Sequence, residues 1–324
     1  MTERYTDVLE MYDMEILGIR RGRGAWILDT DRGCRLLKEY RGTARRLEFE
    51  SEVLKVLEGS SGLKADQYVK NREEELFTSA GDGTHFILKE WFGDRECNLK
   101  EYSEIRSAVT RIGMLHQLLR RVELKPEWNM GSIVGRPMAE EMERHNRELK
   151  RARNFISEKR GKNEFELWVI GGHSAFFEQA LEAAQGLEKM EMGGGLCRYL
   201  CHGDLDQHHV LMGSHYVAIV EYNRMHLGLQ VEDLYRFMRK VMEKHNWNLR
   251  LGGMMLDAYE RVLPMTKEER RALYYLFLYP EKYWKQINYY YNANKAWLPA
   301  RNIDKLKSLK EQEEARQAFL REIK

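Results

Sequence analysis

The pattern of apolar residues changes near residue 92, and this change limits the folds that the chain can adopt. Before it, residues 14–40 and 67–91 hold short apolar runs separated by turns, and residues 43–57 show helical spacing. After it, most segments repeat apolar residues at helical spacing. The sequence therefore predicts an α+β protein with a β-rich lobe at residues 1–91 and a helical lobe at residues 92–324.

Three segments of the second lobe have a distinct character. Asn98 and Glu101 predict a capping-box start for a helix that runs to Leu119. Residues 144–162 form a basic amphipathic helix with eight Lys and Arg residues, a pattern typical of a solvated face and, as the alternative, of a surface for an acidic partner. Residues 279–297 are rich in Tyr and Trp within the helical region that ends the chain.

Charge balance and hydropathy exclude several classes of protein. The chain has 53 Lys and Arg residues and 51 Asp and Glu residues, and its net charge of +2 is too small for a protein that coats nucleic acid or an anionic membrane. No apolar run approaches the roughly 18–20 residues that cross a bilayer, and the first residues lack a signal sequence. We therefore expect a cytoplasmic protein whose partners are neither membranes nor nucleic acids.

The four cysteines are few for a chain of 324 residues, and we expect them to be reduced thiols. A metal site at Cys197, Cys201 and His202 is the alternative, because these three residues lie close together in the sequence. No second pair of ligands at zinc spacing accompanies them, which favours free thiols.

The clearest chemical signal stands at residues 202–211, which read His-Gly-Asp-Leu-Asp-Gln-His-His-Val-Leu, with Glu221 ten residues further on. Apolar runs on either side of Gly213 predict a short hairpin between this loop and Glu221. A polar turn that contains glycine is by itself most often only a turn. Other candidate site residues occur before and after this segment in a consistent order along the chain, and this order favours a functional loop over a simple turn.

This loop resembles the catalytic loop of the aminoglycoside and choline phosphotransferase superfamily, whose fold is kinase-like and whose motif is His-Gly-Asp, four residues, then Asn. The resemblance implies that Asp204 is the base that orients the acceptor hydroxyl and that His202 has a structural role. Both metal positions depart from the family pattern, since His209 replaces the Asn and Glu221 replaces the metal-binding Asp. Glutamate suits magnesium or manganese, whereas imidazole suits softer metals.

Two residues of the first lobe extend the resemblance. Lys38 ends the third predicted strand, where the family places a lysine for the nucleotide phosphates, and Glu50 matches its partner on the next helix. Glu50 also shares the apolar face of Val53, so an inward carboxylate there needs a cation, and Lys38 is predicted to supply it. With a different helix register, Glu48 or Glu52 would take the place of Glu50.

The resemblance also implies the other nucleotide contacts. Residues 86–93 match the strand and hinge whose backbone pairs with adenine, which makes Glu90 and Phe92 cofactor-binding residues. Asp233 matches an Asp that opens a helix beneath the catalytic loop and holds that loop in place. The implied cofactor is ATP with Mg or Mn, and the catalytic and metal residues named above are expected to converge on one cleft between the lobes.

Within that superfamily, nearly the whole chain resembles the CotS-like spore coat proteins of endospore-forming bacteria. The most family-specific segment is 280–292, in which Pro-Glu-Lys-Tyr-Trp is followed by Tyr-Tyr-Tyr-Asn. Its aromatic side chains are expected to pack the base of the helical lobe. The resemblance implies spore coat proteins as partners and a location in the mother-cell cytoplasm and at the spore coat. The other matching segments are 36–38, the helix through Glu50, 91–96, 112–116 and 202–204.

Several residues argue against efficient catalysis. Asp206 adds a negative charge near the position of a transferred phosphate, and the turn at 20–24 lacks a glycine-rich phosphate loop. We therefore expect a spore-coat-associated protein on a kinase-like phosphotransferase scaffold, a pseudokinase with weak or absent phosphoryl transfer. The alternatives are an active ATP-dependent phosphotransferase acting on a small-molecule or protein hydroxyl, and a module that binds an acidic partner through residues 144–162.

Overall fold

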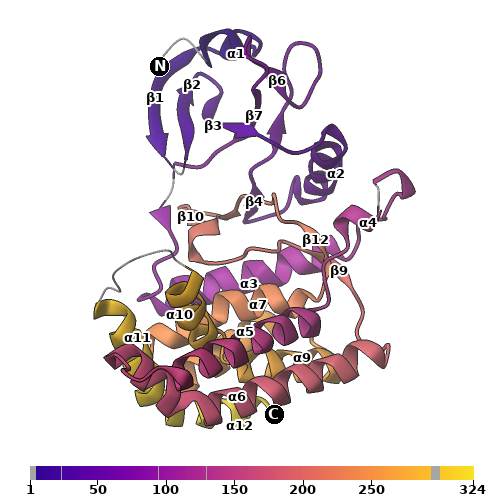
Figure 1. Ribbon diagram of the computed structural model, residues 1–324. Coiled ribbons are helices and arrows are strands. Elements are labelled where there is room, and N and C mark those ends of the chain that lie inside the picture. Colours follow the sequence, from indigo (N-terminus) through magenta and orange to yellow (C-terminus); the bar gives the residue numbers. More distant parts are fainter. Residues whose placement is uncertain (1–4, 23, 94, 129, 293–299) are drawn as a thin grey trace. The chain divides into compact units, whose positions relative to one another are not determined.

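The computed structural model describes residues 5–22, 24–93, 95–128, 130–292 and 300–324 (Figure 1). They form two compact units. The first unit comprises Met1–Val134, Leu200–His226 and Arg261–Leu263, and the second comprises Gly135–Tyr199, Leu227–Glu260 and Pro264–Lys324. The predicted α+β class is confirmed, because sheets and helices both contribute. The first unit includes a helix beyond residue 91 and the loop at 202–211, so the lobe boundary at 91 stays a prediction.

An antiparallel sheet of six strands dominates the first unit, in the order β1-β2-β3-β7-β5 with β6 paired to β7. One of its faces packs on the short helix α1 (Thr6–Glu10), where Leu28, Leu37 and Leu88 form an apolar cluster with Val8. The strands are β1 Ile16–Gly22, β2 Ala25–Thr30, β3 Gly33–Tyr40, β5 Tyr68–Val69, β6 Thr78–Ser79 and β7 His85–Glu90.

Helix α2 (Ala44–Leu54) begins and faces inward as the sequence predicts. The side chain of Thr43 accepts the backbone N–H of Arg46 at 3.3 Å and so caps the helix. Glu50 is buried on the same face as the apolar residues of α2, and a 3-10 turn at Lys55–Leu57 continues that helix. The predicted helix register is therefore right.

A second, smaller sheet of the first unit has the strand order β4-β11-β10-β8. The predicted hairpin after the His-Gly-Asp loop is confirmed, because β10 and β11 are antiparallel with Val210 opposite Ile219. Leu211 and Val220 pack with Leu36 and Trp91, which joins the hairpin to the larger sheet. The strands are β4 Leu63–Ala65, β8 Arg95–Glu96, β10 Val210–Met212 and β11 Val217–Ile219.

Helix α3 (Tyr102–Leu119) is present, but its predicted capping box is wrong. The N-cap residue is Glu101, whose side chain makes no capping hydrogen bond. Asn98 lies one turn too early to cap the helix; its side chain accepts the N–H of Lys100 at 3.1 Å, and its own N–H donates to Glu104 at 2.9 Å. Asn98 therefore stabilises the turn before the helix.

The second unit is mainly helical. The basic helix expected at 144–162 starts and ends earlier than predicted. Tyr283 is buried, which agrees with the packing role expected for the aromatic segment, while residues 293–299 of that segment lie outside the described residues. The long helices are α5 Met138–Glu158, α6 Glu164–Met192, α7 Gln230–Lys244, α8 Leu249–Glu260, α9 Lys267–Leu278, α10 Glu281–Asn292, α11 Ala300–Glu311 and α12 Glu313–Ile323.

The remaining elements are short. They are the helix α4 Met130–Ile133, the 3-10 turns Pro126–Trp128 and Gln207–His209, and the strands β9 Tyr199–Cys201 and β12 His226–Gly228. All four cysteines are free thiols, as predicted. Within the described residues, no helix combines the length and the apolar character needed to span a membrane.

Candidate active site

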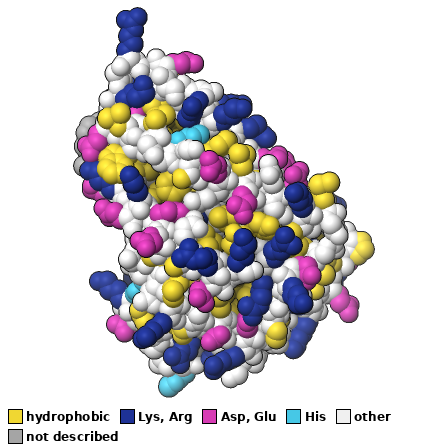
Figure 2. All heavy atoms as spheres, turned by 90° about the horizontal axis from the view of Figure 1, so that it is seen from below, with side chains coloured by type: hydrophobic (Ala, Val, Ile, Leu, Met, Phe, Trp, Pro, Cys, Tyr) yellow, Lys and Arg dark blue, Asp and Glu magenta, His cyan; other side chains and the backbone are white. Residues whose placement is uncertain are grey.

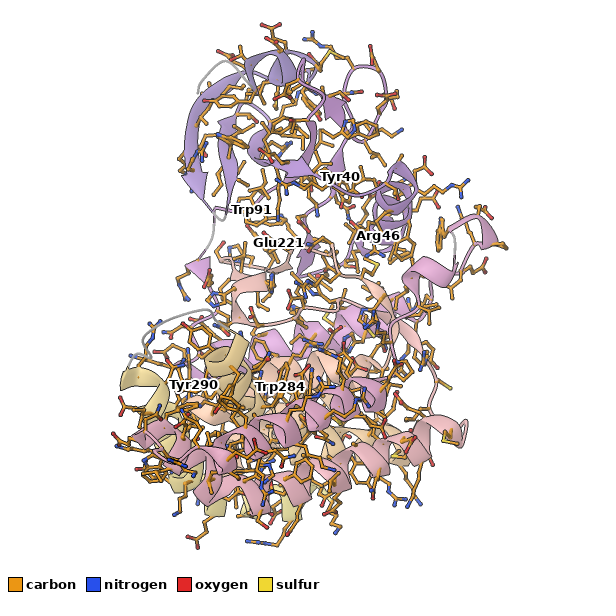
Figure 3. The ribbon with its side chains drawn as sticks, in the orientation of Figure 1. Tyr40, Arg46, Trp91, Glu221, Trp284 and Tyr290 are labelled. Carbon is orange, nitrogen blue, oxygen red and sulfur yellow. The ribbon has the colours of Figure 1, made fainter. Side chains whose placement is uncertain are left out.

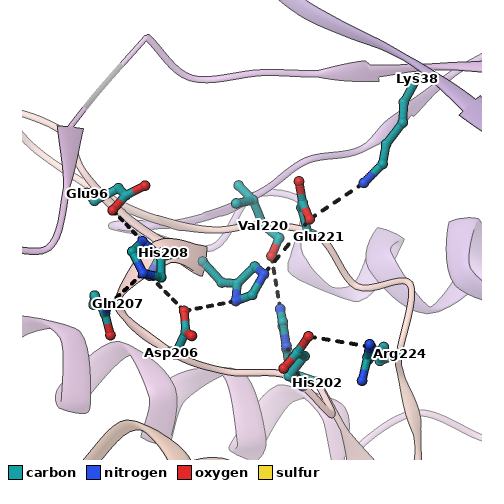
Figure 4. A network of polar contacts seen from close by, with 11 residues as sticks. Lys38, Glu96, His202, Asp206, Gln207, His208, Val220, Glu221 and Arg224 are labelled. Atoms are coloured by element: carbon teal, nitrogen blue, oxygen red, sulfur yellow. Dashed lines mark hydrogen bonds and ion pairs between the residues drawn. The ribbon is translucent and has the colours of Figure 1, made fainter. Parts of the chain in front are cut away.

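The His-Gly-Asp loop is held by its own backbone and by a buried histidine (Figure 4). His202 is fully buried; its Nε2 donates to the carbonyl of Val220 at 3.0 Å, and its Nδ1 accepts the N–H of Asp204 at 3.3 Å. Gly203 has a φ of 87°, and a Cβ on it would lie 2.2 Å from the carbonyl oxygen of Arg224. The loop therefore requires glycine at 203, and His202 joins it to the end of the hairpin. Because both ring nitrogens of His202 are used in this way, it is not available to a metal site with Cys197 and Cys201.

Asp204, the expected base, lies at the surface of this loop. Its side chain is 39% exposed, and its Oδ2 is 3.4 Å from Nε of Arg224. An exposed ion pair of this length is weak and exchanges readily with solvent. Asp204 is thus accessible to a hydroxyl group, with a guanidinium as its present partner.

Glu221 follows β11 and carries the largest set of charged neighbours in the loop region. Its Oε2 lies 3.6 Å from Nζ of Lys38 and 3.8 Å from Nε2 of His209. Its backbone has a φ of 69°, in the left-handed region that a residue with a side chain adopts at a cost, and its N–H donates to Oδ2 of Asp66 at 3.0 Å. This carboxylate therefore lies between the ammonium group of Lys38 and the imidazole of His209 (Figure 4).

His209 places an imidazole between two carboxylates. Its Nδ1 is 3.2 Å from Oδ1 of Asp206, while its Nε2 faces Glu221. Burial lowers the pKa of His209, but Asp206, Glu221 and Asp204 outweigh burial, and the pKa is raised above its ordinary value. The raised pKa widens the pH range in which this imidazole is protonated, and a protonated imidazole cannot bind a metal ion.

Asp206 has a structural role in the loop. Its Oδ1 accepts the N–H of His208 at 2.8 Å and faces the ring of His209. The carboxylate therefore caps the 3-10 turn of the loop. The expectation that its charge opposes a transferred phosphate stays a prediction.

The predicted ion pair between Lys38 and Glu50 is wrong. Glu50 is inward, with its side chain 1% exposed, but its Oε1 binds Nε of Arg46 at 2.5 Å and its Oε2 accepts the hydroxyl of Tyr68 at 2.5 Å. Arg46 lies one helical turn before Glu50 on the same face of the helix, so its guanidinium reaches the carboxylate of Glu50. Lys38 pairs with Glu221, and Glu52 does not replace Glu50, because it pairs with Lys125 at 2.6 Å.

Arg46 also ties α2 to the segment after β11. Its Nη2 donates to the carbonyl of Met225 at 2.6 Å and to that of Asn223 at 3.4 Å. One guanidinium therefore satisfies Glu50 and two backbone carbonyls near Glu221. Charge-assisted hydrogen bonds of this kind fix the geometry of the groups that they join.

Sequence reasoning missed a second buried ion pair beside Glu221. Nζ of Lys89 lies 2.7 Å from Oδ2 of Asp66, and both side chains are almost completely buried. Lys89 also lies 4.4 Å from the ring centre of Tyr68. Burial raises the pKa of Asp66, and Lys89 opposes that rise. A lysine inside the apolar run of β7 was the signal that a buried partner had to exist.

These charged groups line a cavity of about 360 Å³ within the first unit. In Figure 3, Tyr40, Arg46 and Glu221 lie around the same region of that unit, although they come from three different parts of the chain. The charged residues that line it are Lys38, Glu39, Arg41, Arg46, Glu50, Asp66, Lys89 and Glu221. His209 and Glu221 lie close together within the first unit, and Asp204 lies close enough to His209 to raise its pKa. The predicted convergence on a cleft between the lobes stays a prediction.

The remaining expected site residues are Glu90, Phe92 and Asp233. The N–H of Glu90 donates to Gln67 at 2.8 Å, that of Trp91 donates to Cys34 at 3.0 Å, and the side chain of Phe92 is buried. The pairing of this backbone with adenine stays a prediction. Asp233 is buried in the first turn of α7 in the second unit, so its place beneath the loop stays a prediction as well.

The residues at the expected metal positions do not fit a magnesium or manganese ion. Such ions take several oxygen ligands, whereas His209 offers an imidazole that faces two carboxylates. Among the described residues, no group of three or more His, Cys, Asp and Glu side chains is arranged to hold a metal ion. Glu221 supplies one carboxylate, and the ammonium group of Lys38 and the imidazole of His209 lie beside it.

No protein-family model matches the chain, and no curated protein matches it by sequence. Solved structures do match. An aminoglycoside phosphotransferase from Alicyclobacillus acidocaldarius subsp. acidocaldarius has a TM-score of 0.85 at 17% identity, over 97% of this chain and 93% of that chain. A spectinomycin phosphotransferase in complex with ADP and spectinomycin has a TM-score of 0.62 at 12% identity, over 97% and 96%. An amicoumacin kinase in complex with AMP-PNP, Ca²⁺ and Ami has a TM-score of 0.63 at 12% identity, over 98% and 94%.

The fold is therefore that of the aminoglycoside phosphotransferases, a kinase-like α+β fold, as the sequence predicted. At these identities the likeness concerns the fold. The chemistry of this chain has to be argued from its own residues.

Proposed function

We propose that this protein is a spore-coat-associated pseudokinase, built on a phosphotransferase scaffold and weak or inactive in phosphoryl transfer. One observation carries the catalytic part of the proposal: the carboxylate of Glu221 lies between Nζ of Lys38 at 3.6 Å and Nε2 of His209 at 3.8 Å. A carboxylate that already faces an ammonium group and an imidazole is poorly placed to bind a divalent cation.

The rate of phosphoryl transfer depends almost entirely on placing the nucleotide and on neutralising the charge of its phosphates. Each misplaced electrostatic contact costs about a hundredfold to a thousandfold in rate. Here Lys38 is paired with Glu221, and the Asn position holds an imidazole. Two such departures are enough to remove most turnover.

The spore-coat role rests on the resemblance to CotS-like proteins and needs a surface for coat partners. Helix α5 and the turn after it offer one in which Lys150, Arg151 and Arg160 have no carboxylate within ion-pair distance in the described part of the chain. Phe155 is exposed beside them and borders a cavity of about 230 Å³ that is also lined by Trp284. Figure 2 shows Lys and Arg side chains interspersed with acidic and apolar side chains on one face of the molecule. This chemistry fits an acidic protein segment that carries an apolar side chain.

An active ATP-dependent phosphotransferase is the second candidate. The exposed carboxylate of Asp204 favours it, because a general base must reach the acceptor hydroxyl. The cavity of about 360 Å³ beside Lys38 favours it too, since a cavity of this size can admit part of a small molecule. In that case ATP with Mg or Mn would be the cofactor, and a small molecule or a protein would supply the hydroxyl.

The test measures nucleotide binding and ATP consumption with magnesium, with manganese and without metal. We expect negligible turnover by the natural protein, no change in Asp204→Asn, and a gain of metal-dependent ATP binding in the double variant His209→Asn/Glu221→Asp. Asp257→Asn, a change of an exposed acid on α8, is the matched control. Robust turnover by the natural protein that Asp204→Asn abolishes would overturn the pseudokinase in favour of the enzyme.

Coat association is tested separately in sporulating cells. A fluorescent fusion is expected to gather at the spore coat and to do so equally well with Asp204→Asn. Replacing Lys150 and Arg151 by Gln is expected to weaken that localisation, with Arg301→Gln on α11 as the control for lost positive charge. A fusion that stays diffuse throughout sporulation would contradict the spore-coat role and leave the catalytic result unaffected.

A further inference from the structure

A cavity of about 600 Å³ lies within the second unit, between helices α6, α10 and α11. One face of α6 lines it over three turns, from Leu167 and Trp168 through Gly171 to Phe176. Tyr283 of α10 and Leu306 of α11 complete the wall. Small-molecule sites commonly have volumes of about 300–1,000 Å³, so this cavity has the size of a ligand site.

Helix α6 keeps this cavity open with a glycine. Gly171 lies in the interior of a helix of 29 residues, where glycine costs about 1 kcal/mol relative to alanine. A Cβ at Gly171 would meet no atom within 4 Å, so neighbouring side chains do not require a glycine there. The next residue differs, because a Cβ at Gly172 would approach the ring of Phe176 at 3.2 Å. Gly171 therefore leaves space that any larger side chain would occupy.

The wall of the cavity is largely apolar and includes the aromatic rings of Trp168, Phe176 and Tyr283. The rings of Phe176 and Tyr283 stack at 4.7 Å between centres. The hydroxyl of Tyr283 donates to the carbonyl of Val169 at 2.8 Å, so the polar end of that ring is already satisfied. Leu167 is 58% exposed at the rim. An apolar surface of this kind gains stability when a hydrocarbon or aromatic group covers it.

The rim of the cavity has one cation without an acidic partner. Nζ of Lys307 and Nζ of Lys310 lie 5.8 and 5.7 Å from the ring centre of Trp168. Lys307 pairs with Glu164 at 2.9 Å, whereas Lys310 makes no ion pair with any described residue. Glu313, on the other side of the rim, pairs with Arg316 at 3.1 Å. The free charge that a ligand meets at this rim is therefore an ammonium group.

We propose that this cavity binds a small amphiphilic anion, an aromatic or short aliphatic group that carries one carboxylate. The apolar part lies against Trp168, Phe176 and Tyr283, and the carboxylate pairs with Lys310. The inference goes beyond the proposed function, because the site consists only of residues of the second unit and requires neither nucleotide binding nor a coat partner.

The experiment uses the full chain and begins with anilinonaphthalene sulfonate, an aromatic anion whose fluorescence rises in apolar sites. Decanoate, decanol and decylamine are then compared as competitors of equal chain length. We expect saturable binding of one probe molecule per chain and displacement in the order decanoate, decanol, decylamine. A carboxylate that reaches the ammonium of Lys310 should bind roughly threefold to tenfold more tightly than the alcohol.

Two pairs of variants locate the site. Gly171→Leu fills the cavity and is expected to weaken probe binding at least about tenfold by removing buried apolar contact area. Gly253→Leu is its control, because Gly253 is also a helix glycine whose Cβ would meet nothing within 4 Å. Lys310→Gln is expected to abolish the preference for decanoate over decanol, whereas Lys305→Gln on the same helix leaves it unchanged.

The outcomes separate the parts of the proposal. Circular dichroism and thermal melting establish that each variant is folded, and Ala175→Leu fills the other end of the cavity if Gly171→Leu does not fold. Unsaturable probe binding, or equal binding by the natural protein and both cavity-filling variants, would overturn the site. An unchanged order of competitors in Lys310→Gln would overturn the anionic ligand.

Discussion

Buried charged side chains have different roles in the two units. In the first unit, Glu50, Asp66 and Glu221 line a cavity, and each has a cation within 4 Å. In the second unit, Glu281 at the start of α10 binds Nε of Arg239 at 3.2 Å and accepts the hydroxyl of Tyr235 at 2.8 Å, both from α7. The first set borders space that a ligand can enter, whereas the second set joins two helices.

This contrast teaches which substitutions should change function and which should change stability. Arg239 also binds Glu243 at 2.7 Å, and Lys285 pairs with Glu281, so the second network has several members. Breaking a buried pair costs roughly 3–5 kcal/mol, because the remaining charge stays uncompensated. A charge at the edge of a cavity keeps water as an alternative partner and costs less.

The largest effect is expected for Glu281→Gln, with a loss of roughly 4–5 kcal/mol in the free energy of unfolding at pH 7. Although burial acts to raise the pKa of Glu281, Arg239 and Lys285 lower it to about 2. A depressed carboxylate pKa contributes stability above the unfolded value of about 4.5 and loses it as the pH falls toward 2. Urea titrations at pH 7 and pH 3 measure both effects. Equal stability of the natural protein and the variant at pH 7 would show that the network is not important for folding.

The next effect concerns Lys38 and Lys89, which both line the cavity of the first unit. Lys89→Met leaves the buried carboxylate of Asp66 without a cation and should cost about 3 kcal/mol, while Lys38→Met, at a side chain 32% exposed, should cost less than about 1 kcal/mol. The double variant Lys89→Met/Asp66→Leu should recover most of the loss, because it removes both charges. Chemical unfolding measures all four proteins. Equal costs for the two single variants would contradict the distinction between a fully buried ion pair and a partly exposed one.

The smallest effect is expected at Glu232, a buried carboxyl of α7 that forms no ion pair with a described residue. Burial, helped by Asp233 and Glu191 and opposed by Arg236, raises its pKa to about 8. Because a raised carboxyl pKa favours the protonated form, stability falls as the pH rises from about 4.5 to about 8. Glu232→Gln should therefore be more stable than the natural protein by roughly 1 kcal/mol at pH 5, and this gain should rise to roughly 3 kcal/mol at pH 7. The exposed Glu158→Gln is the control, and a pH-independent difference would refute the assignment.

Glu50 shows which parts of the candidate site can be predicted from the sequence. Its inward direction follows from helical periodicity, since α2 presents one apolar face and Glu50 lies on it. Its partner was assigned to Lys38 by resemblance, and the structure gives Arg46 instead. The spacing of four residues between Arg46 and Glu50 was visible in the sequence, but only the packing of α2 against the segment at 223–225 holds Arg46 in that place.

The pairing of Asp66 with Lys89 could not be predicted from the sequence. A lysine inside an apolar strand signals a buried anion but does not name it. The two residues are far apart in the chain, and they meet because Asp66 follows β4 in one sheet while Lys89 lies in β7 of the other. The contact of Asp66 with the backbone of Glu221 likewise depends on the parallel pairing of β4 with β11.

The sequence by itself determined the α+β class, the hairpin after the His-Gly-Asp loop, the start of α2 and the burial of Glu50. These features depend on spacing along the chain, where periods of about 2 and 3.6 residues identify strands, helices and their inner faces. The tertiary structure decided the partner of each charge, the placement of Glu221 between Lys38 and His209, and the cavity left open beside Gly171. Those features depend on distances between segments that are remote in sequence, and a local pattern carries no information about such distances.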